Sequence, residues 1–232
     1  DQRRADAYDE LGLGGTYDLV FRNLPVLYDQ HAQGTRALDF GCGTGRSTRF
    51  LQALGFTTTG VDISAEMVEY ARRHESSGDY RVIVDGDFQS LPRSGFDLIQ
   101  SAFTFDNISG LERRVRIMSG LRKLLDKSGM LVNIVSTPEI YTHEWVTFST
   151  RDFPENATAR GGDVVKIITT DYSDARPVED VLWTHEDYLH LFEASGLEVV
   201  RVERPLATGD EGIAWKSETS IAPWAIYILT LS

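Results

Sequence analysis

Apolar and polar positions alternate along the first half of the chain in a pattern that predicts strands followed by helices. Short apolar runs of β type recur between residues 35 and 136. They occupy residues 35–40, 57–62, 80–85, 96–102 and 130–136. Between these runs apolar residues return every three or four positions, as in Met67, Val68 and Ala71, which is the spacing of a helix with one buried face. Strands that alternate with such helices are typical of a parallel sheet covered by helices on both faces.

The regular pattern is interrupted between residues 137 and 183, where prolines and glycines lie among aromatic and β-branched residues. Two runs in this part, 164–170 and 178–184, are expected to pair as an antiparallel ribbon. A helix pattern then returns with Tyr188, Leu189 and Phe192 facing inward, and a strand follows it. The last run, 223–231, is predicted to close the sheet. We therefore expect a doubly wound α/β domain with about seven strands, mostly parallel with an antiparallel last strand, and an inserted lid after the fifth strand.

Composition and charge limit the class of protein. The chain has 232 residues, which fits one domain. Its net charge of −12 argues against a broad nucleic-acid surface, because such a surface needs clustered Lys and Arg. The five cations of residues 111–123 are expected to form a solvated helix face. No apolar run reaches the ~20 residues that span a bilayer, and the first residues do not resemble a signal peptide, so we expect a cytoplasmic protein without membrane contact.

A glycine-rich turn follows the first predicted strand. The stretch ALDFGCGTGRSTRFL, residues 37–51, has glycines at 41, 43 and 45. Loops at the carboxyl ends of strands in such sheets bind ligands, and glycines let the backbone approach a ligand closely. The dinucleotide fingerprint G-x-G-x-x-G is not matched, because the third glycine comes one position early and Arg46 takes its place. Asp39, at the end of the strand, would repel two phosphates but suits a ligand that carries an ammonium group.

The motif L-D-F-G-C-G-T-G resembles the first motif of class I S-adenosylmethionine-dependent methyltransferases of the small-molecule type. The segments GVDIS (60–64), DGDF (85–88) and FDLIQSAFTF (96–105) follow in the family's order. The resemblance is strong over residues 35–136 and looser over 184–204. It implies a Rossmann-like fold and S-adenosylmethionine as the cofactor, with S-adenosylhomocysteine as the product.

The resemblance also implies a set of residues that contact the cofactor. Asp62 would accept hydrogen bonds from both ribose hydroxyls, a role that suits a carboxylate because it is acceptor-only with two oxygens. Ile63 would lie against the adenine face, Asp87 near the adenine amino group and Phe88 beside the ring. Ser101 stands at a position where the family contacts the methionine part.

Further contacts are implied for the glycine turn and the N-terminal segment. The turn would contribute Asp39, Gly41, Cys42 and Gly43, with the backbone amide of Cys42 mattering more than its sulfur. The segment ADAYDELGLGGTYDLVF resembles the lead helix that caps the cofactor in many members of the family. Within it, Tyr8 and Tyr17 would donate hydrogen bonds to the cofactor's carboxylate, or both would simply pack the helix onto the domain.

Methyl transfer from a sulfonium is an in-line displacement that needs positioning more than a catalytic signature. A base is needed only if the acceptor must lose a proton, and His143 is the candidate for that role. Aromatic side chains can stack on a planar acceptor, although each can also be a core residue. The candidates for the acceptor pocket are Phe103, Tyr141, Trp145 and Trp215. The single cysteine and the spacing of the histidines indicate no metal site and no intrachain disulfide.

The sequence thus predicts a single methyltransferase domain, residues 1–232, which transfers a methyl group to a nitrogen or oxygen of a small-molecule acceptor. Its expected parts are an N-terminal helical cap, a cofactor-binding core, a substrate-side insertion and a C-terminal helix with strands. These parts span residues 1–34, 35–136, 137–183 and 184–232. The alternatives are a protein that binds S-adenosylmethionine without catalysis and an NAD-dependent oxidoreductase, which the early third glycine and Asp39 disfavour. Homodimerisation stays open.

Overall fold

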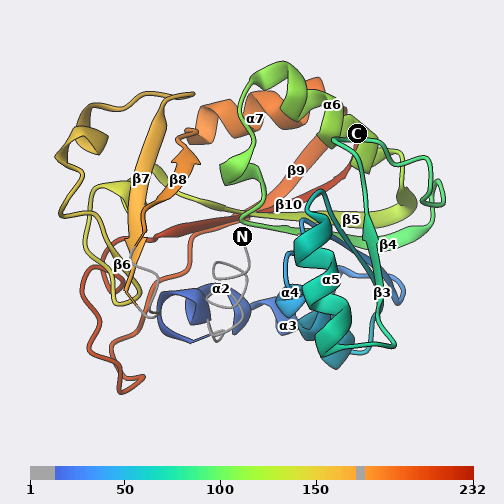
Figure 1. Cartoon of the computed structure of the whole chain (residues 1–232), viewed down its shortest axis with the longest axis horizontal. Helices are drawn as coiled ribbons and strands as arrows, with labels where there is room; N and C mark the ends of the chain where they lie inside the picture. The colour runs from blue at the N-terminus through green and yellow to red at the C-terminus, as the bar shows by residue number, and fades with distance from the viewer. Residues whose placement is uncertain (1–13, 171–175) are drawn as a thin grey trace.

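A seven-stranded sheet forms the centre of the molecule in the computed structural model, which describes residues 14–170 and 176–232 (Figure 1). Its strand order is β3-β2-β1-β4-β5-β10-β9. The strands are β1 (Arg36–Phe40), β2 (Thr57–Asp62), β3 (Asp79–Val82), β4 (Phe96–Ala102), β5 (Leu125–Ser136), β9 (Leu197–Glu203) and β10 (Trp224–Leu231). The first five run parallel to one another, and β10 is antiparallel to both β5 and β9. The predicted mostly parallel sheet with an antiparallel last strand is confirmed.

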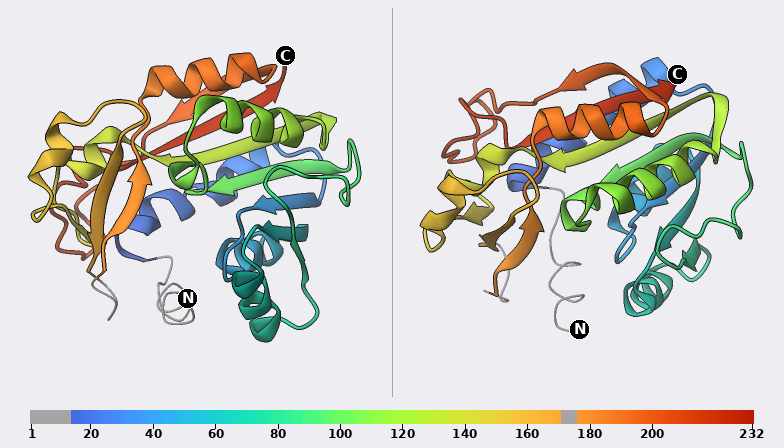
Figure 2. Two further views of the ribbon diagram at one scale, coloured as in Figure 1. Left: turned by 45° about the horizontal axis from the view of Figure 1, so that its top comes forward. Right: turned by 90° about the horizontal axis from the view of Figure 1, so that it is seen from above.

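Helices cover both faces of this sheet (Figures 1 and 2). One face carries α2 (Asp18–Phe21), α3 (Leu24–His31), α4 (Arg46–Ala53) and α5 (Ala65–His74). The other face carries α6 (Leu111–Arg122) and α7 (His185–Ala194). Strand order reverses direction between β1 and β4, and right-handed crossovers then send the following helices to opposite faces. The carboxyl ends of β1 and β4 therefore meet where ligands bind in folds of this type.

Local sequence signals explain where the helices begin. The Ser64 hydroxyl accepts a hydrogen bond from the Met67 amide at the start of α5. Thr184 and Asp187 form a reciprocal capping box at the start of α7. Each such cap contributes about 1 kcal/mol to helix stability. On α7 the expectation for Leu189 is wrong: its side chain is exposed and Leu191 is buried instead.

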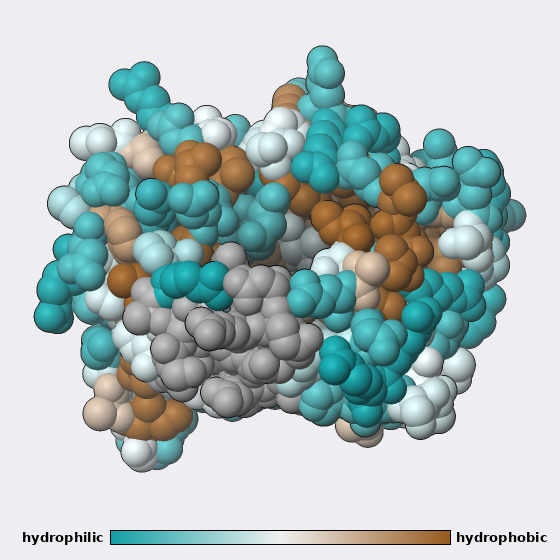
Figure 3. Space-filling view, in the orientation of Figure 1, coloured by the Kyte–Doolittle hydropathy of each residue, from teal (hydrophilic) through white to brown (hydrophobic). Residues whose placement is uncertain are grey.

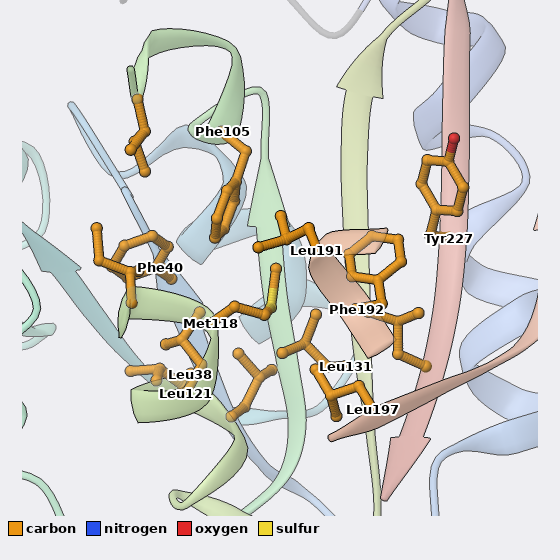
Figure 4. Packing of buried hydrophobic residues seen from close by; sticks show 14 of the residues in the cluster. Leu38, Phe40, Phe105, Met118, Leu121, Leu131, Leu191, Phe192, Leu197 and Tyr227 are labelled. Carbon is orange, nitrogen blue, oxygen red and sulfur yellow. The ribbon is translucent and has the colours of Figure 1, made fainter. Parts of the chain in front are cut away.

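Alternation along each strand divides the core into two clusters, one on each face of the sheet. On β1, Ala37 joins the cluster under α2–α4, whereas Leu38 and Phe40 join the cluster under α6 and α7. Figure 4 shows the second cluster, in which Phe105 and Met118 point toward the sheet. Burying a large apolar side chain contributes roughly 1.5–3 kcal/mol to folding stability. The two clusters therefore hold the helices on the sheet and keep the loops at its carboxyl edge in place.

The insertion forms a small sheet of its own, with strand order β6-β7-β8. Its strands are β6 (Phe148–Ser149), β7 (Val164–Thr169) and β8 (Val178–Val181). The antiparallel pairing of β7 with β8 confirms the predicted ribbon. It is accompanied by two 3₁₀ turns, η3 (Pro138–Tyr141) and η4 (Pro154–Thr158). That this insertion acts as a lid stays a prediction.

Two further expectations about local structure are wrong. The third strand ends at Val82 and not at 85, because a turn with Gly86 at a φ of +79° takes the chain out of the sheet. The basic segment 111–123 is not wholly solvated, since Arg114 is fully buried. Its guanidinium lies 3.8 Å from the centre of the Trp183 ring and donates to the carbonyls of Phe105 and Ile108. Among the described residues, none of the helices has the length and apolar composition to span a bilayer.

Candidate functional site

The backbone amides of the glycine turn are directed at the neighbouring strand. Gly41 and Cys42 both donate to the Val61 carbonyl, at 2.8 and 3.0 Å. Gly43 donates to a carboxylate oxygen of Asp62 at 2.9 Å. A phosphate-binding loop instead directs such amides at its anion. The amides of Gly41, Cys42 and Gly43 are therefore already bonded to β2 and are not directed at a pyrophosphate. The mismatch with the dinucleotide fingerprint also indicated this.

Two glycines of the turn are needed for different reasons. Gly43 has a φ of +52°, and a Cβ added there would meet no atom within 4 Å. It lines the large cavity described next, so a side chain at this position would project into open space. Gly41 has a φ of +77°, and a Cβ there would lie 2.0 Å from the Thr104 hydroxyl oxygen. Gly41 thus allows β1 to pack against the segment after β4.

A cavity of about 750 Å³ lies at the carboxyl edge of the sheet, between the glycine turn and the insertion. In the face seen in Figure 3, hydrophobic side chains gather around a hollow near the centre of the molecule. Of the residues predicted from the sequence, eight line the cavity. They are Tyr17, Gly41, Cys42, Gly43, Asp62, Ile63, Phe103 and Tyr141. Its volume lies in the range of sites that bind small molecules.

Asp62 and Ile63, at the end of β2, form one part of the cavity wall. One oxygen of Asp62 accepts the Gly43 amide at 2.9 Å and the other accepts the Ser64 amide at 2.8 Å. Each carboxylate oxygen has a further lone pair, so Asp62 is oriented by the backbone and can still accept hydrogen bonds from a diol. Beside it the Ile63 side chain is 59% exposed, an apolar surface suited to a flat ring.

Asp39 lies at the end of β1, as expected, but it is not among the residues that line the cavity. Its carboxylate is fully buried and accepts hydrogen bonds from the Ser47 and Thr48 hydroxyls at 2.6 and 2.7 Å. Burial raises the pKa of this carboxyl group. The reason is the pleat of β1, which turns Asp39 toward α4 and away from the face of Phe40. Asp39 therefore fixes the start of α4 and does not line the cavity.

The predictions for Asp87, Phe88 and Ser101 are also not matched by the cavity wall. Asp87 is exposed and accepts the Gln89 amide within a turn, at 3.0 Å. Phe88 is buried in the core under α6, edge-on to Phe40. Ser101 is fully buried inside β4, and its hydroxyl has no hydrogen-bond partner among the described residues. Ser101 lies inside the sheet and Phe88 lies in the core, so neither side chain reaches the cavity.

Asp85 and Gly86 line the cavity in the region where Asp87 was expected. Asp85 forms ion pairs with Arg113 at 2.6 Å and Arg116 at 2.9 Å, which tie this turn to α6. These arginines hold the pKa of the Asp85 carboxyl below its ordinary value. The pairs are exposed, so their main effect is to position the turn.

At the N-terminal segment, Tyr8 falls outside the described residues, whereas Tyr17 lines the cavity. The Tyr17 ring stacks on Trp224 with centroids 5.6 Å apart, and the Arg46 guanidinium lies 5.0 Å from its centre. Cys42 is buried, and burial raises its thiol pKa well above the ordinary value. A raised pKa opposes nucleophilic chemistry at this sulfur.

The opposite end of the cavity is lined by Phe103 and Tyr141. Phe103 has a φ of +60°, which is uncommon for a residue with a side chain and is enriched at functional sites. Tyr141 is buried and donates its hydroxyl to Asp180 at 3.1 Å. Both residues thus line the cavity, and their contact with an acceptor stays a prediction.

Three other acceptor-side predictions are not matched. Trp145 is fully buried in the core, with its ring nitrogen donating to the Ile140 carbonyl. Trp215 packs against the core and donates to Glu211, outside the cavity. The His143 ring contacts the Glu139 carbonyl on the outer side of η3 and does not line the cavity either. Aromatic composition marked the right segment but could not tell core from cavity wall.

Asp106 is a cavity residue that sequence reasoning missed. It lies in the 3₁₀ turn η2 (Phe105–Asn107) after β4 and is 3% exposed. It accepts the Ser136 amide and hydroxyl at 3.0 and 2.8 Å and the Tyr188 hydroxyl at 3.3 Å. Burial raises its pKa to about 6. The rule that loops after strand ends carry ligand residues could have indicated it. Within the described residues, no cluster of His, Cys, Asp and Glu has the arrangement of a metal site.

Comparison with known proteins finds methyltransferases among the relatives of this chain. Residues 38–133 match a family described as "Methyltransferase domain". The chain is 27% identical to N-demethylindolmycin N-methyltransferase of Streptomyces griseus, over 81% of this chain and 79% of that protein. It is 35% identical to an uncharacterized methyltransferase of Bacillus licheniformis, over 55% of this chain and 62% of that protein.

Solved structures share the fold. An S-adenosylmethionine-dependent methyltransferase from Clostridium acetobutylicum superposes with a TM-score of 0.68 at 15% identity, covering 100% of this chain and 98% of that one. DesVI from Streptomyces venezuelae superposes with a TM-score of 0.67 at 19% identity, covering 99% and 98%. Both likenesses extend over the insertion as well as the seven-stranded sheet.

Proposed function

This chain is a class I S-adenosylmethionine-dependent methyltransferase, and we propose that it methylates a nitrogen or oxygen of a small-molecule acceptor. The observation that carries the proposal is one continuous cavity of about 750 Å³. It extends from Gly43 and Asp62, beside the glycine turn, to Phe103 and Tyr141, beside the insertion. A cofactor at Gly43 and Asp62 and an acceptor at Phe103 and Tyr141 would share one continuous cavity.

The residues at the glycine turn fit S-adenosylmethionine. The missing side chain of Gly43 leaves room for the ligand, Asp62 offers carboxylate lone pairs to a ribose diol, and Ile63 offers an apolar face to adenine. We assign the cofactor's amino acid part to the side of Tyr17 and Arg46, which both line the cavity and where the positive charge of the guanidinium favours a carboxylate. When bound, the cofactor supplies an electrophilic methyl group on a positively charged sulfur.

The protein's own contribution to the reaction is positioning. Aligning two reactants in one site can supply about 7–11 kcal/mol of the barrier. The aromatic walls from Tyr17, Phe103 and Trp224 are suited to this task, because they are packed against one another with centroid distances of 4.6–5.6 Å. Such walls also exclude water and tolerate a nearby cation.

The name of the Streptomyces griseus relative, an N-methyltransferase of N-demethylindolmycin, supports a small-molecule acceptor. The identity of 27% does not transfer that substrate to this chain, whose acceptor is proposed only as a class. A cytoplasmic location and the oligomeric state stay predictions.

Titration calorimetry tests the proposal. S-adenosylhomocysteine should bind with a dissociation constant on the order of micromolar, which corresponds to about −8 kcal/mol, and NAD should not bind. The Gly43→Val variant serves as the control for the site, because it fills the space at the turn. The opposite preference, NAD over S-adenosylhomocysteine, would contradict the proposal. Binding without turnover on any acceptor from a metabolite library would favour a non-catalytic binding protein.

A further inference from the structure

Asp106 enters the cavity directly beside the glycine turn. Thr104, two residues earlier, donates its hydroxyl to the Phe40 carbonyl at 3.0 Å and lies against Gly41. The turn η2 is thereby fixed to the end of β1. Asp106 lines the same cavity as Gly43 but comes from the β4 side, where Phe103 also lies. Asp106 thus lines a cavity that also includes the residues proposed for the cofactor and for the acceptor.

The carboxylate of Asp106 has hydrogen-bond donors but no cation as a direct partner within the described residues. Its donors are Ser136 and Tyr188. The nearest basic side chain, Arg114, donates to two backbone carbonyls, and its Nη1 atom has no hydrogen-bond partner in the described part of the chain. A buried carboxylate without a paired cation is costly. A cationic ligand in the cavity would offset part of that free-energy cost.

The pKa values of two tyrosines beside Asp106 indicate how this part of the cavity affects the ionisation of a bound acid. Burial raises the pKa of both Tyr141 and Tyr188 well above the ordinary phenol value. Negative charge raises it further, from Asp180 and then Asp106 for Tyr141 and from Asp106 for Tyr188. A phenol acceptor held here would therefore also keep its proton. Desolvation acts in the opposite direction on an ammonium group, because there the charged form is the protonated one. The Asp106 charge at the same time stabilises an ammonium group that it contacts, so these surroundings bind a protonated amine and oppose the ionisation of a phenol.

We propose that the acceptor is a basic amine, and that Asp106 binds its ammonium group and receives the proton that frees the nitrogen lone pair. The N–H bond breaks and an O–H bond forms on Asp106. The lone pair then forms the N–C bond to the methyl carbon as the C–S bond breaks, and that bond's electrons stay on sulfur. The methylated product carries the positive charge, and Asp106 later returns its proton to water. This inference rests on the proposed function.

Other titratable groups surround Asp106 and set its response to pH. They come from α6, η3, β8 and α7 and are Arg114, Tyr141, Asp180 and Tyr188. Arg114 lowers the pKa of Asp106, whereas burial has the larger effect and raises it to about 6. Ammonium binding needs the ionised carboxylate, so amine affinity should fall about tenfold for each pH unit below that value.

The test compares three probes of similar skeleton: 2-phenylethylamine, 2-phenylethanol and phenylacetate. Each is titrated into protein saturated with S-adenosylhomocysteine, at about pH 7 and about pH 5. We expect the amine to bind at least about tenfold more tightly than the other two at the higher pH, in line with a charge-assisted hydrogen bond. The preference should shrink about tenfold at the lower pH.

Variants separate a binding role from a structural one. Asp106→Asn keeps the shape and the acceptor for the Ser136 amide, and should lose both the amine preference and its pH dependence. Asp152→Asn, an exposed carboxylate of the insertion, is the matched control and should keep both. Equal binding of amine and alcohol, or an amine preference that survives in Asp106→Asn, would overturn the inference. Failure of S-adenosylhomocysteine to bind would instead contradict the proposed function.

Discussion

Replacing Asp62 with asparagine tests the cofactor end of the cavity. The side chain receives backbone hydrogen bonds on both oxygens, from Gly43 at 2.9 Å and from Ser64 at 2.8 Å. Asparagine has only one oxygen, so its amide NH₂ would face one of these donors. The variant would remove the negative charge, one acceptor for a ribose hydroxyl and one anchor of the glycine turn.

The expected loss follows from these contacts. A hydrogen bond to a charged group contributes about 1.5–3 kcal/mol, so affinity for S-adenosylhomocysteine should fall roughly 10- to 150-fold. The orphaned amide of Gly43 or Ser64 would cost about 1–3 kcal/mol of folding stability if it were fully buried. Because Asp62 is only partly buried, water can replace part of that bond and the cost should lie near the lower limit. At about 2–4 °C per kcal/mol, the melting temperature should fall by a few degrees.

Calorimetry of the Asp62→Asn variant measures affinity, and thermal unfolding without ligand measures stability. Asp152→Asn again provides the matched control, because it makes the same chemical change on an exposed side chain. The reasoning is refuted if Asp62→Asn binds S-adenosylhomocysteine as tightly as the unaltered protein. It is also refuted if the loss of affinity is explained by global unfolding at the assay temperature.

Three further changes probe the turn and the acceptor side. Gly43→Val should abolish S-adenosylhomocysteine binding in calorimetry while circular dichroism still shows a folded chain, and retained affinity would place the ligand elsewhere. Gly41→Ala should lower stability by about 2–4 kcal/mol in urea unfolding, since strain at positive φ adds to a clash with Thr104, and an unchanged midpoint would disprove that clash. Burial raises the Asp106 pKa to about 6, so its stabilising effect is complete below about pH 3.9 and lost as pH rises through 6. Between about pH 4 and 7 the unaltered protein should thus lose roughly 3 kcal/mol relative to Asp106→Asn, and parallel urea curves would contradict this.

The sequence predicted the sheet well because its strands are apolar runs with clear ends. The expected bounds 57–62 and 96–102 coincide with β2 and β4. The cofactor end was predicted partly, since the resemblance placed Asp62 and Ile63 correctly at the cavity. It could not say that Asp39 faces α4, because the direction of a side chain at a strand end depends on the pleat and on which helix covers that face.

The acceptor end was harder to predict, because its residues come from distant parts of the chain. The Asp106 carboxylate is held by hydrogen bonds from Ser136 and Tyr188, thirty and eighty-two positions away in the sequence. No local sequence pattern predicts contacts over such separations. Arg114 shows the same limit, since a charged residue within a basic run becomes fully buried only because η2 leaves carbonyls that need a donor.

A crystal structure of the complex with S-adenosylhomocysteine is the most direct test of the account. It should show the ribose hydroxyls on the Asp62 carboxylate, the adenine against Ile63, and the sulfur directed toward the part of the cavity that holds Phe103 and Asp106. A ligand bound away from the glycine turn, or turned so that its sulfur points away from Asp106, would contradict the proposed cavity and the role of its residues.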